Sequence, residues 1–345
     1  MDGLNLKQLA AMVHAIAEEK NLPEETVLNV VEQAIAAAWR RDNGDRELNV
    51  RAILNQNDGT AKIIVRYDVV EAPENASQLS LAEAKKIDKN ALLEGVIEQE
   101  FEASSFGRVA AQTAKQVLLQ KLREAEREVV AEEFDGKVGQ ILTGTVVRTE
   151  PRVVRIEIGR GVGIMPSSEQ IQGERLQVGS RIKILLKDIE RDQRGPQIIL
   201  SRATPDFVKV LFQQEVPEIE NGTVEIKAIS REAGRRTKIA VSSNVPGVDP
   251  VGTFVGGKGV RVQAVMNEIG DAEKIDIVTW DADTKNFIAN ALSPAEISRI
   301  DVNEDDKKAT VHVAESQQSI AIGKQGQNVR LASALTGYEL DIAME

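Results

Sequence analysis

The sequence predicts a multidomain α+β protein, and three observations support this prediction. The 345 residues exceed what one compact core usually organises, so two to four domains are expected. From Gly136 to Arg202, short β-branched runs replace the helical pattern that precedes them. From about Pro205 onwards, one order of helices and strands occurs twice. We therefore expect an N-terminal α+β domain, a small β-barrel and two copies of one α+β unit.

Composition excludes several classes of protein. The sequence has no cysteines, which removes disulfides, thiolate metal sites and a cysteine nucleophile and fits a reducing cytosol. Residues 1–20 alternate polar and apolar positions at helical spacing and do not form a signal peptide. No stretch is long and apolar enough to cross a membrane, so we expect a cytoplasmic protein without a membrane partner. The formal net charge of -11, taken alone, argues against a nucleic-acid-binding protein.

Two helices and a hairpin are predicted at the start of the chain. The apolar positions of 4–19 and 24–40 recur at helical spacing. Pro23 lies between them and suits a helix start, because its missing N–H would have no partner in the first turn. A β-hairpin over 48–70 is expected next, since Asn57-Asp58-Gly59 is a strong turn signal.

A long helix is predicted from about Ser104 to Glu133. Its apolar positions recur at heptad-like spacing and the others are rich in Lys, Arg and Glu, so one face should be buried. The positions expected on that face are Val109, Thr113, Val117, Leu118, Leu122, Ala125 and Val129. The N-terminal domain, residues 1–134, is expected to end with this helix.

Residues 135–202 are predicted to form a closed five-stranded barrel of the OB type. The strands are expected over 141–148, 153–158, 163–165, 181–189 and 197–201. OB folds often hold single strands by stacking bases on aromatic side chains, but this segment contains no Phe, Tyr or Trp. Contact with RNA phosphate and plain solvation are equally good interpretations of its arginines, which are Arg148, Arg152, Arg155 and Arg160.

Residues 203–281 and 282–345 are predicted to be two copies of one unit with the element order αββααβ. The matched positions are Val255 with Ile322, Val262 with Val329, Gly270 with Gly337, and Ile275-Asp276-Ile277 with Leu340-Asp341-Ile342. A repeat at this level of detail indicates one structural unit used twice.

Each copy carries a G-x-x-G tetrapeptide between two predicted helices, Gly256-Gly257-Lys258-Gly259 and Gly323-Lys324-Gln325-Gly326. Outer glycines let a nucleic-acid backbone lie directly against the protein backbone. The following helix directs free N–H groups and its positive dipole end towards phosphate, and Lys258 or Lys324 adds a charge. This arrangement is that of a type II KH domain, which clamps about four nucleotides of single-stranded RNA. One such tetrapeptide would be weak evidence, since ordinary glycine turns share it, but two in matching contexts favour the KH interpretation.

The candidate RNA-binding residues lie in and just after the two turns. They are Gly256, Gly257, Lys258, Gly259, Arg261, Gly323, Lys324, Gln325, Gly326, Gln327, Asn328 and Arg330. An apolar groove for unstacked bases is expected beside each turn, lined by Val255, Ile275 and Ile277 in the first copy and by Ile322, Leu340 and Ile342 in the second.

A basic hairpin offers weaker support for RNA binding. Arg231, Arg235, Arg236 and Lys238 fall within eight positions, opposed there only by Glu232. Runs of charge are more often a solvated surface than a binding site, so this hairpin carries little weight by itself.

Catalytic and cofactor interpretations are weak. Residues 252–258 match the start of a Walker A loop, but Gly259 stands where Ser or Thr should ligate magnesium. Residues 159–163 resemble part of a dinucleotide-binding fingerprint, yet a barrel turn fits their strand-rich surroundings better. His14 and His312 fall in different domains, and no HExxH or EF-hand spacing occurs. We expect no catalytic residue, cofactor or metal.

Several stretches resemble motifs of the NusA family of bacterial transcription factors. They are 111–117 with 123–127, 215–219, 224–228, 249–252, 261–265, 274–278 and 322–333. The last stretch, IGKQGQNVRLAS, is highly specific. The first turn departs from the family pattern, because Gly257 stands where a bulkier residue is common, so looser RNA binding is expected there.

The resemblance implies a non-catalytic role in transcription. In this family the N-terminal domain docks on RNA polymerase near the RNA exit channel, and a barrel of the ribosomal S-one type forms one surface with both KH domains for the emerging transcript. The implied partners are RNA polymerase, nascent single-stranded RNA and other Nus antitermination factors. The implied activities are pausing, hairpin-dependent termination and antitermination. The alternative is a general single-stranded RNA-binding or processing accessory without polymerase contact, and the N-terminal domain discriminates between the two.

Overall fold

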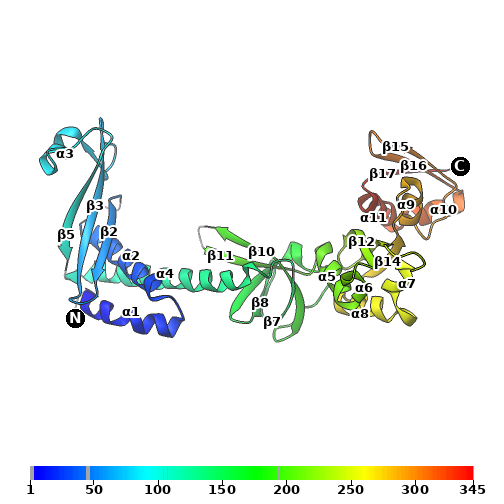
Figure 1. Ribbon diagram of the computed structural model, residues 1–345, viewed down its shortest axis with the longest axis horizontal. Coiled ribbons are helices and arrows are strands. Elements are labelled where there is room, and N and C mark those ends of the chain that lie inside the picture. Colours follow the sequence, from blue (N-terminus) through cyan, green and yellow to red (C-terminus); the bar gives the residue numbers. More distant parts are fainter. Residues whose placement is uncertain (1–3, 44–46, 104, 107, 193–194, 345) are drawn as a thin grey trace. The chain divides into compact units, whose positions relative to one another are not determined.

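The computed structural model describes residues 4–43, 47–103, 105–106, 108–192 and 195–344 (Figure 1). The chain divides into two compact units, one comprising residues 1–133 with 191–196 and the other residues 134–190 with 197–345. Among the residues that the structure describes, no helix is long and apolar enough to span a membrane.

The N-terminal unit packs helices on an antiparallel-rich sheet. Its first elements are β1 (Leu4–Asn5), α1 (Leu6–Lys20), α2 (Glu24–Asp42), β2 (Asn49–Asn55) and β3 (Thr60–Val70). Pro23 lies directly before α2, and β2 pairs with β3 as a hairpin, so both predictions are confirmed. The apolar faces of α1, α2 and the hairpin meet in one core that includes Leu6, Val31 and Ile63.

The rest of the sheet comes from a segment for which no elements were predicted. It contains β4 (Gln78–Ser80), α3 (Leu81–Ile87) and β5 (Val96–Ala103). The next strand, β6 (Ser105–Phe106), pairs with β1 in a separate two-stranded sheet, so the helix predicted from about Ser104 begins later than expected. Ser80 and Glu83 form a capping box at the start of α3, a signal that the sequence offered. Because β5 pairs antiparallel with β3 along eight residues, β3 becomes a central strand of the sheet. Figure 1 shows α3 at the end of β3 that is far from α1.

The long helix is α4 (Arg108–Asp135), and its buried face differs in part from the predicted one. Ala110, Ala114 and Leu122 are buried in the core of the N-terminal unit, and Val117, Leu118, Ala125 and Val129 pack against it. Val109 is 58% exposed and Thr113 is half-buried, so the prediction was wrong for Val109. The two alanines allow close packing one turn apart, which a count of large apolar residues overlooks. Ser104, the predicted start, lies outside the described residues.

The second unit begins with a closed five-stranded barrel, as predicted. Its elements are β7 (Ile141–Glu150), β8 (Val153–Ile158), β9 (Gly161–Pro166), the 3-10 turn η1 (Ser167–Glu169), β10 (Arg181–Asp192) and β11 (Gly195–Ser201). The strand order is β10-β11-β9-β8-β7, and β7 closes on β10. Residues 159–163 form the turn and first residues of the β8–β9 hairpin, which removes the dinucleotide-binding interpretation.

Two repeats with the same order of main elements follow the barrel, which confirms the predicted repeat; the first has one additional short helix, α6. The first contains α5 (Pro205–Glu215), α6 (Pro217–Glu220), β12 (Val224–Glu232), β13 (Arg236–Ser243), α7 (Pro250–Val255), α8 (Val260–Ile269) and β14 (Lys274–Thr279). The second contains α9 (Thr284–Ala291), β15 (Arg299–Asn303), β16 (Lys308–Val313), α10 (Glu315–Ile322), α11 (Gln327–Thr336) and β17 (Glu339–Met344). In each sheet the middle strand pairs antiparallel with the first strand and parallel with the last.

The barrel and the two repeats share their apolar cores. Ile171 and Leu185 of the barrel segment belong to the same buried cluster as Phe207 and Phe254 of the first repeat. Ala240 and Val278 of the first repeat belong to the cluster that fills the second repeat. The barrel and the two repeats are therefore packed against one another through shared buried residues.

Buried cations hold this body together. The Arg202 side chain is 2% exposed and donates to Glu174 of the barrel segment at 2.7 Å and to Glu268 of α8 at 3.0 Å. Arg231 and Glu273 are both fully buried and are joined by a hydrogen bond of 2.7 Å. Glu273 also accepts from the Thr237 hydroxyl at 2.6 Å, so the buried carboxylate is well satisfied. Isolated buried charges would be strongly unfavourable, and these interactions remove that penalty.

Lys238 makes the third such connection. Its side chain is fully buried, lies 3.4 Å from Asp276 and donates to the Ser293 carbonyl at 3.1 Å. Burial lowers the pKa of Lys238, and the Asp276 carboxylate offsets this only in part. Because Ser293 follows α9, this lysine connects the two repeats.

The basic hairpin is thus not the clustered basic surface that its sequence suggests, because two of its four cations are buried. Arg231 pairs with Glu273, and both Lys238 and Arg236 pair with Asp276. Only Arg235 of the four is exposed. The expectation of a clustered basic surface was wrong because the acidic partners of these residues lie far along the sequence.

Replacing Arg231 with Met should lower the free energy of unfolding of the second unit by about 3–5 kcal/mol, because Glu273 would stay buried without its cation. Urea unfolding followed by Trp280 fluorescence, in a Trp39→Phe background, measures this. Lys308→Met, which breaks the exposed pair with Glu339, is the control and should cost less than about 1 kcal/mol. Equal losses for the two variants would contradict a structural role of the buried pair.

A candidate RNA interface at the two glycine turns

The two G-x-x-G turns have the same backbone conformation. The first outer glycines, Gly256 and Gly323, have φ/ψ of 75°/168° and 74°/172°. The third positions, Lys258 and Gln325, are left-handed at 57°/23° and 56°/28°. Left-handed backbone costs a residue with a Cβ about 1–2 kcal/mol, and such cost tends to occur at functional sites. The segments η2 (Gly257–Gly259) and η3 (Lys324–Gly326) therefore form the same type of turn.

The outer glycines are needed for two different reasons. A Cβ on Gly323 would lie 2.7 Å from the backbone nitrogen of Asn328, and one on Gly256 would lie 2.8 Å from the Arg261 side chain. At Gly259 the φ is +77° but no atom lies within 4 Å of the Cβ position, so that side of the turn is open. The first glycine lets the turn close on the helix behind it, and the last is favoured because its φ is positive.

The lysines occupy different positions of the two turns. Lys258 is the third residue of its turn, whereas Lys324 is the second residue of the other. Both side chains are exposed, and neither makes an ion pair within the described ranges of the chain. Gly257 stands opposite Lys324 in the repeat and has open space around its Cβ position, so nothing in the fold requires glycine there.

Arg261 and Asn328 support the turns from behind. Arg261 donates to the Thr253 carbonyl at 2.8 Å and to Glu218 at 3.1 Å. The Asn328 side chain is buried, and its amide donates to the carbonyls of Leu292, Ile320 and Ala321 at 2.9, 3.2 and 3.2 Å. Direct contact of the buried Asn328 side chain with RNA would require it to leave these partners. The Arg261 side chain is 27% exposed and keeps unused N–H donors, so its contact with RNA stays a prediction.

Gln327 and Arg330 of the second turn contact the first repeat. Gln327 donates to Glu232 at 2.8 Å, and Arg330 approaches the same carboxylate to 2.6 Å. Burial alone would raise the pKa of Glu232, but the bonds from Gln327 and Arg330 outweigh it and hold this pKa below the ordinary value. No local pattern in the sequence indicated this junction between the repeats.

The residues predicted to line the apolar grooves differ in burial, and Ile275, Ile277 and Ile342 pack against the repeat cores. Val255, Ile275, Ile277, Ile322 and Ile342 are half-buried, as groove walls should be. Leu340 is 7% exposed and belongs to the core of the second repeat, so it is not a groove residue.

The Walker A interpretation is excluded by the fold around the first turn. Residues 250–255 form α7, where a phosphate-binding loop would require a strand followed by an irregular loop. Asp249 caps this helix by accepting from the Val251 N–H at 3.0 Å.

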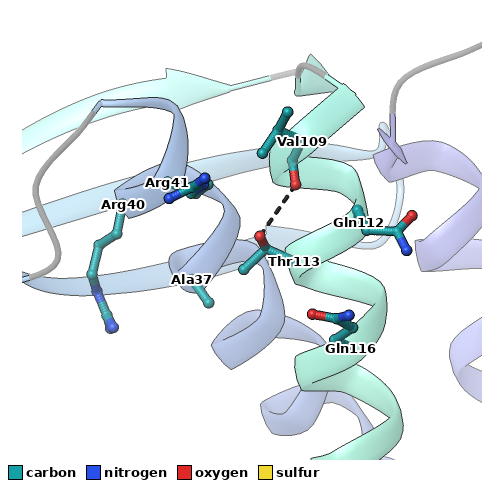
Figure 2. A pocket seen from close by; sticks show the side chains of 7 residues that line it. All are labelled: Ala37, Arg40, Arg41, Val109, Gln112, Thr113 and Gln116. Carbon is teal, nitrogen blue, oxygen red and sulfur yellow. Dashed lines mark hydrogen bonds between the residues drawn. The ribbon is translucent and has the colours of Figure 1, made fainter.

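A separate cavity lies in the N-terminal unit, between α2 and α4 (Figure 2). Its volume is about 750 Å³, and it is lined by Ala37, Arg40, Arg41, Val109, Gln112, Thr113 and Gln116. Figure 2 shows Val109, Thr113 and Gln116 projecting from α4 towards α2. Val109 is thus an exposed residue that lines this cavity, which its heptad position did not indicate.

Comparison with known proteins assigns the chain to a family. Four family models match, in the order NusA N-terminal domain (8–128), S1 RNA binding domain (136–202), NusA-like first KH domain (202–280) and NusA-like second KH domain (284–345). The transcription termination/antitermination protein NusA of Bacillus subtilis is 44% identical over 331 residues, covering 96% of this chain and 89% of that protein. The chain belongs to the NusA family. The resemblance that the sequence motifs suggested is thereby confirmed.

Other members of the family are similar over comparable lengths. NusA of Thermus thermophilus is 41% identical over 348 residues, which cover 98% of this chain and 89% of that protein. Among solved structures, the N-terminal domain of NusA from B. subtilis is 35% identical, covering 35% of this chain and 98% of that one, with a TM-score of 0.27.

Replacing Gly323 with Ala should destabilise the second unit by more than about 1 kcal/mol, because both the positive φ and the nearby Asn328 backbone oppose a Cβ. The matched change Gly257→Ala should stay within about 0.5 kcal/mol, since its Cβ position is open. The urea midpoint of the second unit measures both. Equal tolerance of the two alanines would show that the close approach at Gly323 is relaxed in solution.

Proposed function

We propose that this protein is a non-catalytic transcription factor that acts in pausing, termination and antitermination. In this proposal, residues 1–134 bind RNA polymerase, and the barrel and both KH domains bind the nascent transcript. Other Nus factors would be further partners, and the cytoplasm would be the compartment. The observation that carries the RNA part is the pair of turns with matching backbone angles and exposed lysines. The relatives are transcription termination/antitermination proteins, which supports the wider role.

The RNA-binding proposal fits the geometry of the turns. An RNA backbone can approach the open face at Gly259, and Lys258 or Lys324 can neutralise a phosphate. Because the barrel and both repeats share cores, a strand that leaves one KH domain meets the next at a fixed distance. This favours one long transcript over several unrelated ligands.

The polymerase-binding proposal is supported by the cavity between α2 and α4. It combines an exposed apolar side chain, Val109, with the cations Arg40 and Arg41 and with amide groups. Protein interfaces commonly combine an apolar anchor with a polar rim.

Lys258→Asp and Lys324→Asp should each weaken binding to single-stranded RNA and flatten its salt dependence, because each removes a cation that neutralises a phosphate. The slope of log K against log salt should fall by about 0.7 for each phosphate that is no longer neutralised. Fluorescence anisotropy with a labelled RNA oligonucleotide measures both quantities. Lys209→Asp on α5 makes the same charge change at an exposed site outside the turns and is the control. Unchanged affinity in the Lys258→Asp/Lys324→Asp double variant would refute the assignment of the clamps.

Capture of core RNA polymerase should be weakened about tenfold by Val109→Asp, the effect of losing on the order of 1.4 kcal/mol at an anchor. Leu119→Asp is the matched control, because Leu119 is an exposed apolar residue of α4 outside the lining of this cavity. Retention is measured with immobilised full chain and, separately, with residues 1–134. No retention of polymerase by either would favour the accessory function instead.

A further inference from the structure

A second cavity lies where the two KH domains meet, within the second unit. Its volume is about 320 Å³, at the lower end of the range of about 300–1,000 Å³ for small-ligand sites. Lys324, Gln325, Gln327 and Arg330 line it from the second turn and α11. Its remaining lining residue, Arg235, comes from the turn between β12 and β13 of the first KH domain.

The charges around this cavity are unbalanced. Arg330 is paired with Glu232 at 2.6 Å, which fixes its guanidinium at the rim. Lys324 makes no ion pair within the described part of the chain, and the hydrogen-bond partner of Arg235 is the neutral side chain of Gln172, at 3.1 Å. The Glu232 carboxylate also attracts Arg235, but its hydrogen bonds go to Gln327 and Arg330. Three cations therefore share one carboxylate at this cavity, and an anion between Arg235 and Lys324 would relieve their repulsion.

Arg235 is held in place by the barrel. Gly234, next to it, has a φ of +80°, and a Cβ there would lie 2.4 Å from the Gln172 carbonyl oxygen. The Gly234 N–H donates to the buried Glu273 at 2.7 Å. The turn that carries Arg235 is thus fixed by the barrel on one side and by the buried Arg231–Glu273 pair on the other.

We propose that this cavity is a phosphate subsite shared by the two KH domains. Arg235 of the first domain and Lys324 of the second together hold one phosphodiester group of an RNA strand that occupies the second clamp. The amides of Gln325 and Gln327 can donate further hydrogen bonds, and Glu232 keeps Arg330 at the rim. The proposal rests on the proposed RNA binding and adds a requirement: the second clamp is complete only with a residue of the first KH domain.

The test compares Arg235→Ala and Lys324→Ala, alone and combined, in the full chain. Each single variant should weaken binding to a single-stranded RNA oligonucleotide by about threefold to tenfold and lower the salt slope by about 0.7. Because both cations serve one phosphate, the double variant should lose less than the product of the single losses. Arg235→Lys, which keeps the charge, should restore most of the salt slope.

A single neutral methylphosphonate, moved along the RNA one linkage at a time, locates the phosphate. At one linkage it should weaken binding to the unaltered protein but have no further effect on Arg235→Ala or Lys324→Ala. Competition with excess inorganic phosphate separates a general anion site from a strand-specific one. Loss of the Arg235 effect in phosphate buffer, with no sensitive linkage, would overturn the proposal.

Two controls separate a phosphate interaction from other roles of Arg235. Gln172→Ala removes its barrel partner without changing charge, and Lys209→Ala removes an exposed charge elsewhere on the second unit. Because Gln172 positions Arg235, Gln172→Ala should weaken binding no more than Arg235→Ala does and should add nothing to it. If Arg235→Ala behaved like Lys209→Ala while Lys324→Ala still weakened binding, the shared subsite would be wrong and the RNA-binding function would stand. Absence of RNA affinity in the unaltered protein would overturn the proposed function itself.

Discussion

The arrangement of the second unit depends on two buried guanidinium groups. Arg202 and Arg231 lie 5.1 and 5.9 Å from the Phe207 ring, and their carboxylate partners come from the barrel segment, α8 and the segment before β14. Burying such groups contributes little net stability, because desolvation offsets most of the attraction. Their contribution is to orientation: each planar guanidinium donates hydrogen bonds at fixed angles to several elements at once and so fixes how these elements pack. The orientation of the barrel relative to the first KH domain follows from these bonds.

Patterns close together in the sequence predicted most of the fold. Turn residues, β-branched runs and the repeated glycines identified the barrel and both KH domains, because these signals act over a few residues. The segment between β3 and α4 was missed, although the capping box at Ser80 and Glu83 was available. Pairings across long separations could not be predicted: Arg231 meets Glu273 at a separation of 42 residues, and Arg330 meets Glu232 at 98. For this reason the basic hairpin was misjudged and the junction between the KH domains was not foreseen.

Comparison of the two G-x-x-G turns shows which features of the motif are needed for its backbone conformation. The left-handed third position occurs in both, once with Lys258 and once with Gln325, so its conformation is imposed by the turn and not by glycine. The lysine stands at the third position of the first turn and at the second position of the other, so its position is not fixed by the conformation of the turn. Arg261 and Asn328 fix the geometry from behind by different bonds, which explains why their side chains differ.

The shared cores have a consequence for how the second unit comes apart. Ala240 and Val278 lie in the core of the neighbouring repeat, and Ile171 and Leu185 lie in that of the first repeat. Cutting the chain at either junction would expose these apolar side chains to water, so a single excised module should be less soluble and less stable than the whole. Melting should then proceed as one cooperative transition across all three modules. A transcript bound anywhere on them would protect the entire unit from proteases.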